Sequence, residues 1–169
     1  MLTPPEAMDS FRAIIERGKN TSTYKMALAL AIARMVEGNK RYVNKRELAG
    51  LFFEIYLDRL EVDMPQLSDP TKSTRVEQAI AGFKSGTLTK EQAISRIENE
   101  AFRDVLPRFH TVNGVQVPVK FYSYTSSGLS LTDAAFMVFQ SPERDKLLQE
   151  IHRKWSLLEE TFARSRLGE

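Results

Sequence analysis

The sequence of 169 residues contains no cysteine, and it has only two histidines and one tryptophan. The absence of cysteine excludes disulfide bonds, thiolate metal sites and a cysteine nucleophile. The longest apolar run, residues 26–33, is too short to cross a bilayer, and residues 1–9 lack the features of a secretory signal. We therefore expect a cytoplasmic protein that does not span a membrane.

Motifs that carry chemistry are also missing. There is no H-E-x-x-H pair, no G-x-S-x-G turn, and no glycine pattern typical of nucleotide binding. His110 stands beside Phe109 before an expected turn, so we expect a hydrogen-bonded structural histidine. His152 adjoins Arg153 and Lys154 on an expected helix and should lie at the surface. The sequence predicts no catalytic residue, no metal site and no cofactor.

The overall composition is that of a folded globular protein, with 42% hydrophobic and 27% charged residues. The length fits one domain. The net charge of +2 is too small to argue for nucleic acid by itself. Residues 1–50 hold nine Lys and Arg against five Asp and Glu, an excess that indicates either a basic face or an ordinary solvated surface.

Helical patterns cover most of the chain. Residues 23–37 are apolar or small at nearly every position, with Lys25 and Arg34 the only charges before Glu37. A helix that is apolar on nearly every side belongs at the centre of a bundle. Amphipathic patterns predict further helices at residues 5–17, 45–60, 73–83, 90–105, 131–139 and 142–164, with a loop at 61–71.

Several residues mark the expected ends of these helices. Gly18 should end the first helix, and Asn44 should cap the helix that starts at residue 45. Thr89 and Gln92 form a capping-box pattern, and Pro107 should close the helix that this box begins.

Residues 109–131 differ in character from the rest. The Asn113-Gly114 pair suits a tight hairpin turn, β-branched and aromatic residues follow, and Pro118 suits an edge strand. A second turn ends at Gly128, before a third short strand at 129–131. We expect a mainly α fold: an orthogonal multi-helix bundle carrying a small antiparallel flap. A single domain, 1–169, would comprise a core at 5–141 and a C-terminal helix at 142–166.

Basic residues cluster around the two ends of the expected central helix and the start of the next. The predicted contacts to DNA or to a protein partner are Lys19, Tyr24, Lys25, Lys40, Arg41, Lys45 and Arg46. Helix N-termini and Lys or Arg side chains are common phosphate contacts, although a solvated rim explains the cluster equally well. Lys25 stands out because its stem can lie along the apolar core while its ammonium reaches outward.

Four motifs follow one another along the chain. They are residues 23–31 (TYKMALALA), Leu48-Ala49 followed by Tyr56, residues 106–110 (LPRFH) followed by Phe121-Tyr122, and residues 155–162 (WSLLEETF). In this order they resemble the N-terminal helical domain of prokaryotic HNH endonucleases of the restriction and defence type. The resemblance spans roughly residues 10–165.

The resemblance implies a non-catalytic domain that recognises DNA or a partner and positions a nuclease. The family's ββα-metal catalytic unit would follow the Trp155 helix, beyond Glu169, so no active-site residue is carried over. Two alternatives remain. One is a protein-interaction or dimerisation module, which would pair with a second copy or a nuclease module through Leu147, Ile151, Trp155, Leu158 and Phe162. The other is a small enzyme with carboxylates in a cleft near Glu98, Glu100 and His110.

Overall fold

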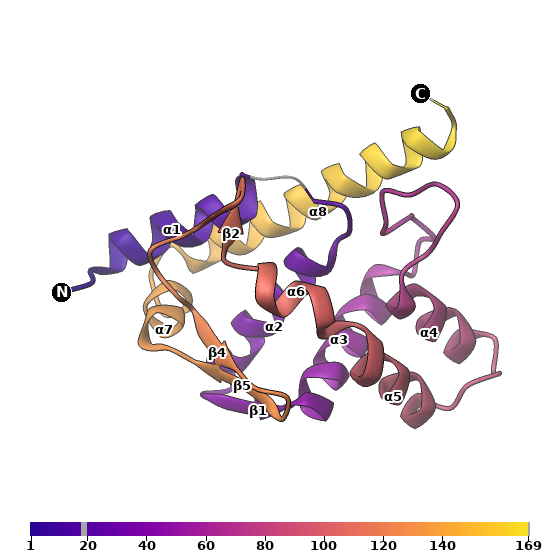
Figure 1. Cartoon of the computed structure of the whole chain (residues 1–169), viewed down its shortest axis with the longest axis horizontal. Coiled ribbons are helices and arrows are strands. Elements are labelled where there is room, and N and C mark those ends of the chain that lie inside the picture. Colours follow the sequence, from indigo (N-terminus) through magenta and orange to yellow (C-terminus); the bar gives the residue numbers. More distant parts are fainter. Residues whose placement is uncertain (18–19, 169) are drawn as a thin grey trace.

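The computed structural model describes residues 1–17 and 20–168, and within them the chain is mainly helical, as predicted (Figure 1). Eight helices make up 60% of the chain, accompanied by two small antiparallel sheets in the described residues. The helices are α1 (Pro4–Glu16), α2 (Tyr24–Glu37), α3 (Lys45–Arg59), α4 (Arg75–Lys84), α5 (Lys90–Glu100), α6 (Phe102–Arg108), α7 (Asp133–Phe139) and α8 (Arg144–Arg166). The strands are β1 (Tyr42–Asn44), β2 (Thr111–Val112), β3 (Val115–Gln116), β4 (Tyr122–Tyr124) and β5 (Gly128–Leu131).

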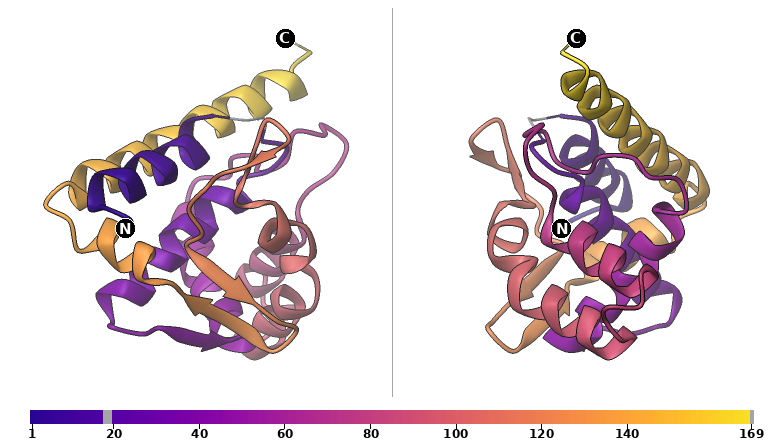
Figure 2. Two further views of the ribbon diagram at one scale, coloured as in Figure 1. Left: turned by 60° about the vertical axis from the view of Figure 1, so that its left-hand side comes forward. Right: turned by 90° about the vertical axis from the view of Figure 1, so that its right-hand side faces the viewer.

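Helix α2 is the interior rod that the sequence predicts. Met26 to Val36 are all buried except Arg34, and α3, α6, α7 and α8 pack around them (Figures 1 and 2). Alanine and leucine favour the helical conformation here, and the alanines let neighbouring helices approach closely. Each fully buried large side chain, such as Ile32, stabilises the fold by about 1.5–3 kcal/mol.

The predicted helix starts are confirmed at two positions. Asn44 caps α3 in a capping box with Glu47, and Thr89 caps α5 in one with Gln92. The prediction that Pro107 closes a helix running from residue 90 was wrong. That helix breaks at Ala101 into α5 and α6, and Pro107 lies inside α6. Because proline has no backbone N–H, α6 lacks one helical hydrogen bond at this position. Gly18, the predicted end of the first helix, lies outside the described residues.

The antiparallel flap is present, but it forms two separate sheets. Asn113 and Gly114 have φ angles of 51° and 79°, as a hairpin turn between β2 and β3 requires. Strands β4 and β5 pair with each other, and β5 also pairs with β1, which gives the order β1-β5-β4. Strand β1 was not predicted from the sequence, and Pro118, expected in an edge strand, lies outside the strands of the described residues.

Helix α8 lies beside α1 along one side of the molecule (Figures 1 and 2). Its apolar stripe faces inward, and Leu147, Ile151 and Trp155 have no exposed surface. Leu158 and Phe162 are buried in the same core. The side chains expected to pair with another chain are therefore covered by this one. No helix in the described part of the chain is long and apolar enough to span a membrane.

A buried polar network centres on Gln66, in the loop between α3 and α4. Its Oε1 accepts hydrogen bonds from Thr23 Oγ1 and Trp155 Nε1, each at 2.7 Å. Its Nε2 donates to Glu159 Oε2 at 2.6 Å, and Arg59 donates to the same carboxylate from the other side at 2.7 Å. Because every polar atom of the Gln66 amide is paired, the network joins α2, α3 and α8 without an unsatisfied buried group.

Candidate functional site

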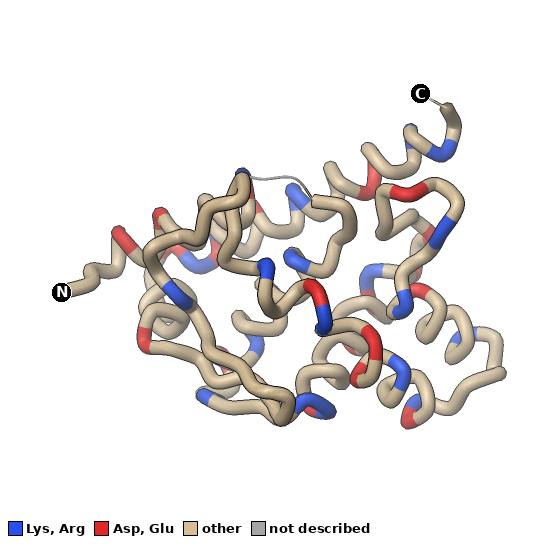
Figure 3. The backbone as a smooth tube through the Cα atoms, viewed as in Figure 1, with Lys and Arg blue, Asp and Glu red and all other residues tan. Residues whose placement is uncertain are grey.

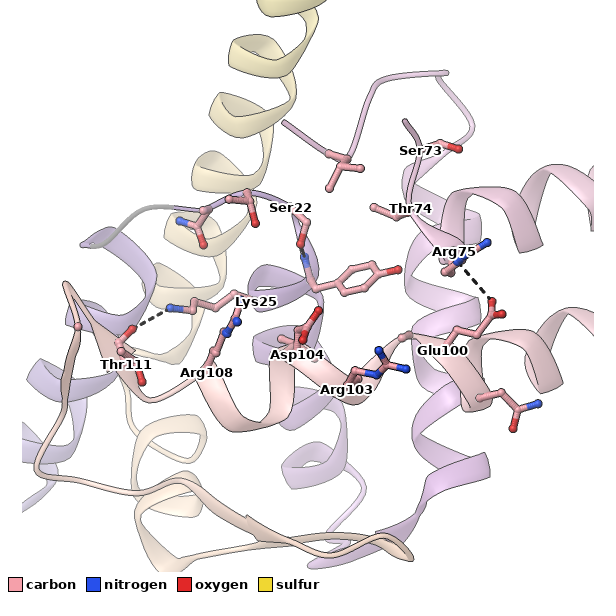
Figure 4. A pocket seen from close by; sticks show the side chains of 18 of the residues that line it. Ser22, Lys25, Ser73, Thr74, Arg75, Glu100, Arg103, Asp104, Arg108 and Thr111 are labelled. Atoms are coloured by element: carbon pink, nitrogen blue, oxygen red, sulfur yellow. Dashed lines mark hydrogen bonds and ion pairs between the residues drawn. The ribbon is translucent and has the colours of Figure 1, made fainter. Parts of the chain in front are cut away.

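A cleft of about 760 Å³ opens where the N-terminal ends of α2 and α4 approach α6 and the β2–β3 hairpin (Figure 4). This volume lies within the range of small-molecule and cofactor pockets. We call it the α2 cleft. Its lining comprises Asn20–Ser22, Tyr24, Lys25, Leu67, Ser73–Arg75, Asn99–Ala101, Arg103–Val105, Arg108, Thr111, Asn113 and Gly114.

Lys25 enters the cleft from the first turn of α2. Its side chain is half-buried, and Nζ donates a hydrogen bond to the carbonyl oxygen of Thr111 at 3.1 Å. Burial lowers the pKa of the ammonium group. The apolar stem follows the core while the charged end meets the cleft, as expected for a lysine at the edge of a buried helix.

Tyr24 forms part of the cleft wall. Its ring packs edge-to-face against Phe52 and Tyr56, with ring centres 6.2 Å apart in both cases. Its hydroxyl accepts a hydrogen bond from the Val76 amide at 3.3 Å, near the start of α4, and burial raises the pKa of the phenol. Tyr24 therefore holds the N-terminal ends of two helices together.

Three arginines complete the basic lining. Arg103 and Arg108 are exposed residues of α6 and form no ion pair within the described residues, whereas Arg75 lies 3.9 Å from Glu100. With Lys25 they give four cations against the two carboxylates of Glu100 and Asp104. These arginines were not predicted from the sequence, because no local motif connects Arg75 on α4 with Arg103 and Arg108 on α6.

The start of α2 has an unusual cap. Thr23, at the N-cap position, makes no side-chain hydrogen bond to the helix, because its hydroxyl is bonded to Gln66 and to Tyr56 in the core. Ser22 Oγ instead accepts from the Tyr24 amide at 3.3 Å. The positive end of the helix dipole therefore points toward the cleft without a capping side chain on the next amides.

The other predicted contact residues lie elsewhere. Lys40, Arg41, Lys45 and Arg46 follow the opposite end of α2, roughly 20 Å away along a helix of 14 residues. Lys40 pairs with Glu47, Arg41 pairs with Asp133 at 2.8 Å, and Arg46 pairs with Glu91 and Glu98 at 2.7 and 3.2 Å. Lys45 donates through its backbone amide to Ser127. Lys19 lies outside the described residues.

The structure therefore divides the predicted basic cluster into two. Of the described members, Tyr24 and Lys25 line the α2 cleft, and the rest lie near carboxylates or strand β5. Figure 3 shows Lys and Arg interleaved with Asp and Glu along the backbone. Exposed ion pairs of this kind leave little net field for a distant partner.

The carboxylate residues considered for an enzyme do not converge. Glu98 pairs with Arg46, Glu100 lies near Arg75, and His110 is buried. His110 Nε2 accepts from the Phe121 amide at 2.9 Å, which confirms the expected structural hydrogen bond. Within the described ranges, no group of three or more His, Asp or Glu side chains is placed to hold a metal ion.

The pKa of His110 is lowered to about 4, mainly by burial, with smaller contributions from the charges of Lys120 and Lys25. The ring is therefore neutral at pH 7, as its role of hydrogen-bond acceptor requires. His152 is exposed on α8, as predicted.

Comparisons with models of protein families, with curated proteins and with solved structures gave no match to this chain. The resemblance to HNH endonucleases therefore stays a prediction from its ordered motifs.

Proposed function

We propose that this chain is a non-catalytic recognition domain that binds DNA through the α2 cleft. The observation that carries the proposal is the cation surplus of this cleft. Lys25, Arg103 and Arg108 line it, and none of them forms an ion pair within the described residues. Phosphate oxygens are the ligands that such groups favour, and Arg binds them through two parallel hydrogen bonds.

The ordered motifs support a more specific role. By resemblance, the domain would belong to an HNH endonuclease-like protein of the restriction and defence type and would position its nuclease module on DNA.

Salt-dependent binding tests the proposal. A fluorescent DNA containing a duplex segment and a single-stranded tail presents both forms, and its anisotropy reports binding between 50 and about 200 mM NaCl. We expect affinity to fall steeply with salt. Each phosphate contact contributes about 0.7–0.9 to the slope of log affinity against log salt concentration.

A matched pair of variants locates the site. Arg103→Gln with Arg108→Gln removes two cleft charges and should lower the slope by about 1.5 and the affinity at least ten-fold. Lys146→Gln with Arg153→Gln removes the same charge from α8, outside the cleft. This control should change both values much less. Equal losses in the two variants, or no binding by micromolar protein at low salt, would refute the proposal.

A further inference from the structure

We propose that the α2 cleft accepts an unpaired DNA strand and excludes the duplex. This inference rests on the proposed function and names the form of nucleic acid that the site takes. It follows from the position of Lys25 inside the cleft, the size of the cleft and the chemistry of its lining.

Lys25 places its charge inside the cleft. Its side chain is half-buried, and its ammonium group is bonded to the carbonyl oxygen of Thr111. Figure 4 shows Lys25 beside Thr111, with Thr74 and Arg75 on the opposite side of the view. A phosphate that contacts Lys25 therefore lies among the lining residues of the cleft.

The cleft is small compared with a DNA duplex. Its volume of about 760 Å³ lies within the range of pockets that hold one small molecule. A nucleotide is a ligand of that size, whereas a duplex, whose major groove alone is about 12 Å wide, is much larger. We therefore expect one nucleotide of a strand to enter the cleft.

The lining of the cleft offers groups that can recognise an unpaired base. Asn20, Asn99 and Asn113 offer amide donors and acceptors, and Tyr24 offers part of an aromatic ring. Bases present their Watson–Crick edges and both ring faces only when they are unpaired. Stacking on an aromatic side chain combined with a basic groove is the usual chemistry of single-strand binding. The cleft contains both components.

The other basic cluster around α2 is less available to an anion. The cations at the far end of α2 are engaged with carboxylates. Arg41 pairs with Asp133, and Arg46 pairs with both Glu91 and Glu98. A phosphate would have to break these pairs to bind there, so the α2 cleft is the better anion site of the two clusters.

A competition experiment tests the inference with the full chain. The probe is a labelled 12-nucleotide single strand, and the competitors are the same strand unlabelled, its blunt duplex, and inorganic phosphate. We expect the strand to compete at least ten-fold better than the duplex, and inorganic phosphate to compete only weakly.

Variants of Lys25 connect this preference to the cleft. Lys25→Met keeps the apolar stem and removes the charge, so single-strand affinity should fall about ten-fold while the weaker duplex affinity stays unchanged. Lys25→Arg should retain most of the affinity, and Lys146→Met on α8 is the matched control. Circular dichroism verifies that each variant is folded. Arg108→Gln, at an exposed position, should also lower the affinity for the single strand more than that for the duplex.

The outcomes separate the two proposals. If the duplex binds as tightly as the strand and the Arg103→Gln and Arg108→Gln changes weaken it, the proposed function stands and this inference is wrong. If Lys25→Met leaves single-strand affinity unchanged, the inference is also wrong. If neither form of DNA binds at low salt, both proposals fail.

Discussion

Gln66 offers the sharpest test of the polar core. It lies in a loop, yet its side chain is fully buried and its amide makes hydrogen bonds to Thr23, Trp155 and Glu159. The orientation of this amide follows from chemistry. The indole N–H of Trp155 is a donor and requires the amide oxygen as its acceptor, whereas the carboxylate of Glu159 is an acceptor and requires the amide nitrogen as its donor. Two substitutions of similar size separate the roles of these atoms.

Gln66→Leu removes both polar atoms. Trp155 Nε1 then has no acceptor in a buried site, which costs about 1–3 kcal/mol. Thr23 keeps its bond to Tyr56, and Glu159 keeps Arg59. Because leucine adds apolar burial that offsets part of this cost, we expect a net loss in the free energy of unfolding of about 1–2 kcal/mol, independent of pH.

Gln66→Glu keeps the acceptor for Trp155 but replaces the donor to Glu159 with an oxygen. Two carboxylates at hydrogen-bond distance repel each other, so above neutral pH the loss should reach about 3–5 kcal/mol. A proton shared between them restores the bond. The folded variant holds this proton at pH values where the unfolded chain releases it, so the penalty should decrease as pH falls from 8 toward 5.

Urea unfolding followed by tryptophan fluorescence measures both effects, since Trp155 is the only tryptophan and belongs to the network. Circular dichroism in the same samples reports the helices. If Gln66→Glu is as stable as the wild type at pH 8, the expected repulsion between the two carboxylates is absent. The prediction is also wrong if the stability of Gln66→Glu depends on pH in the same way as that of Gln66→Leu.

Three further predictions concern other parts of the fold. The pKa of His110 is about 4 in the folded chain and near 6.5 in the unfolded chain. The free energy of unfolding should therefore fall by up to about 3 kcal/mol as pH drops from 6.5 to 4, which urea titrations at several pH values would show. Gly128→Ala places a methyl group against the backbone carbonyl oxygen of Val43 and 2.9 Å from Asn44 Cα, neither of which can move aside freely, and should cost at least about 2 kcal/mol. Gly50→Ala, in an open helical position, should stabilise by about 0.5–1 kcal/mol, and thermal unfolding compares the two variants. Arg166→Ala removes three hydrogen bonds to carbonyls of the loop at 67–72 and should speed tryptic cleavage there with little change in global stability.

Features set by neighbouring residues were predictable from the sequence. The apolar run of α2 identified the core helix, since no other placement buries so many side chains at once. The Asn113-Gly114 pair predicted the hairpin because both residues tolerate a positive φ. Thr89 was recognised as a cap because its partner stands three residues later.

Features formed by residues that are distant in the sequence could not be predicted, because no local pattern marks them. Strand β1 has three residues and no period of its own, and it exists because β5 lies beside it. Gln66 looked like an ordinary loop residue, since nothing near it in sequence reveals three partners on other elements. The break at Ala101 likewise follows from packing, as a helical pattern continues through it.

The cleft was predictable only in part. Lys25 was predicted as a contact because it is a charged residue in an otherwise apolar helix. Arg103 and Arg108 have the pattern of surface residues on an amphipathic helix and were not predicted. Their common position depends on where α6 packs against the start of α2. Clustering Lys and Arg by sequence position instead grouped Lys25 with Arg41 and Arg46, which lie at the other end of the helix.

The start of α2 links the stability of the core to the proposed binding site. Thr23 turns its hydroxyl inward to Gln66, so its side chain does not cap the helix, and Ser22 accepts only from the Tyr24 amide at the end where Tyr24 and Lys25 line the cleft. A capping hydroxyl would stabilise the helix by about 1 kcal/mol but would occupy amides that an anion can bind. Leu67, next to Gln66, lines the same cleft, so the buried network also holds one of its walls in place. A site formed in this way is rigid before ligand arrives, which lowers the conformational cost of binding.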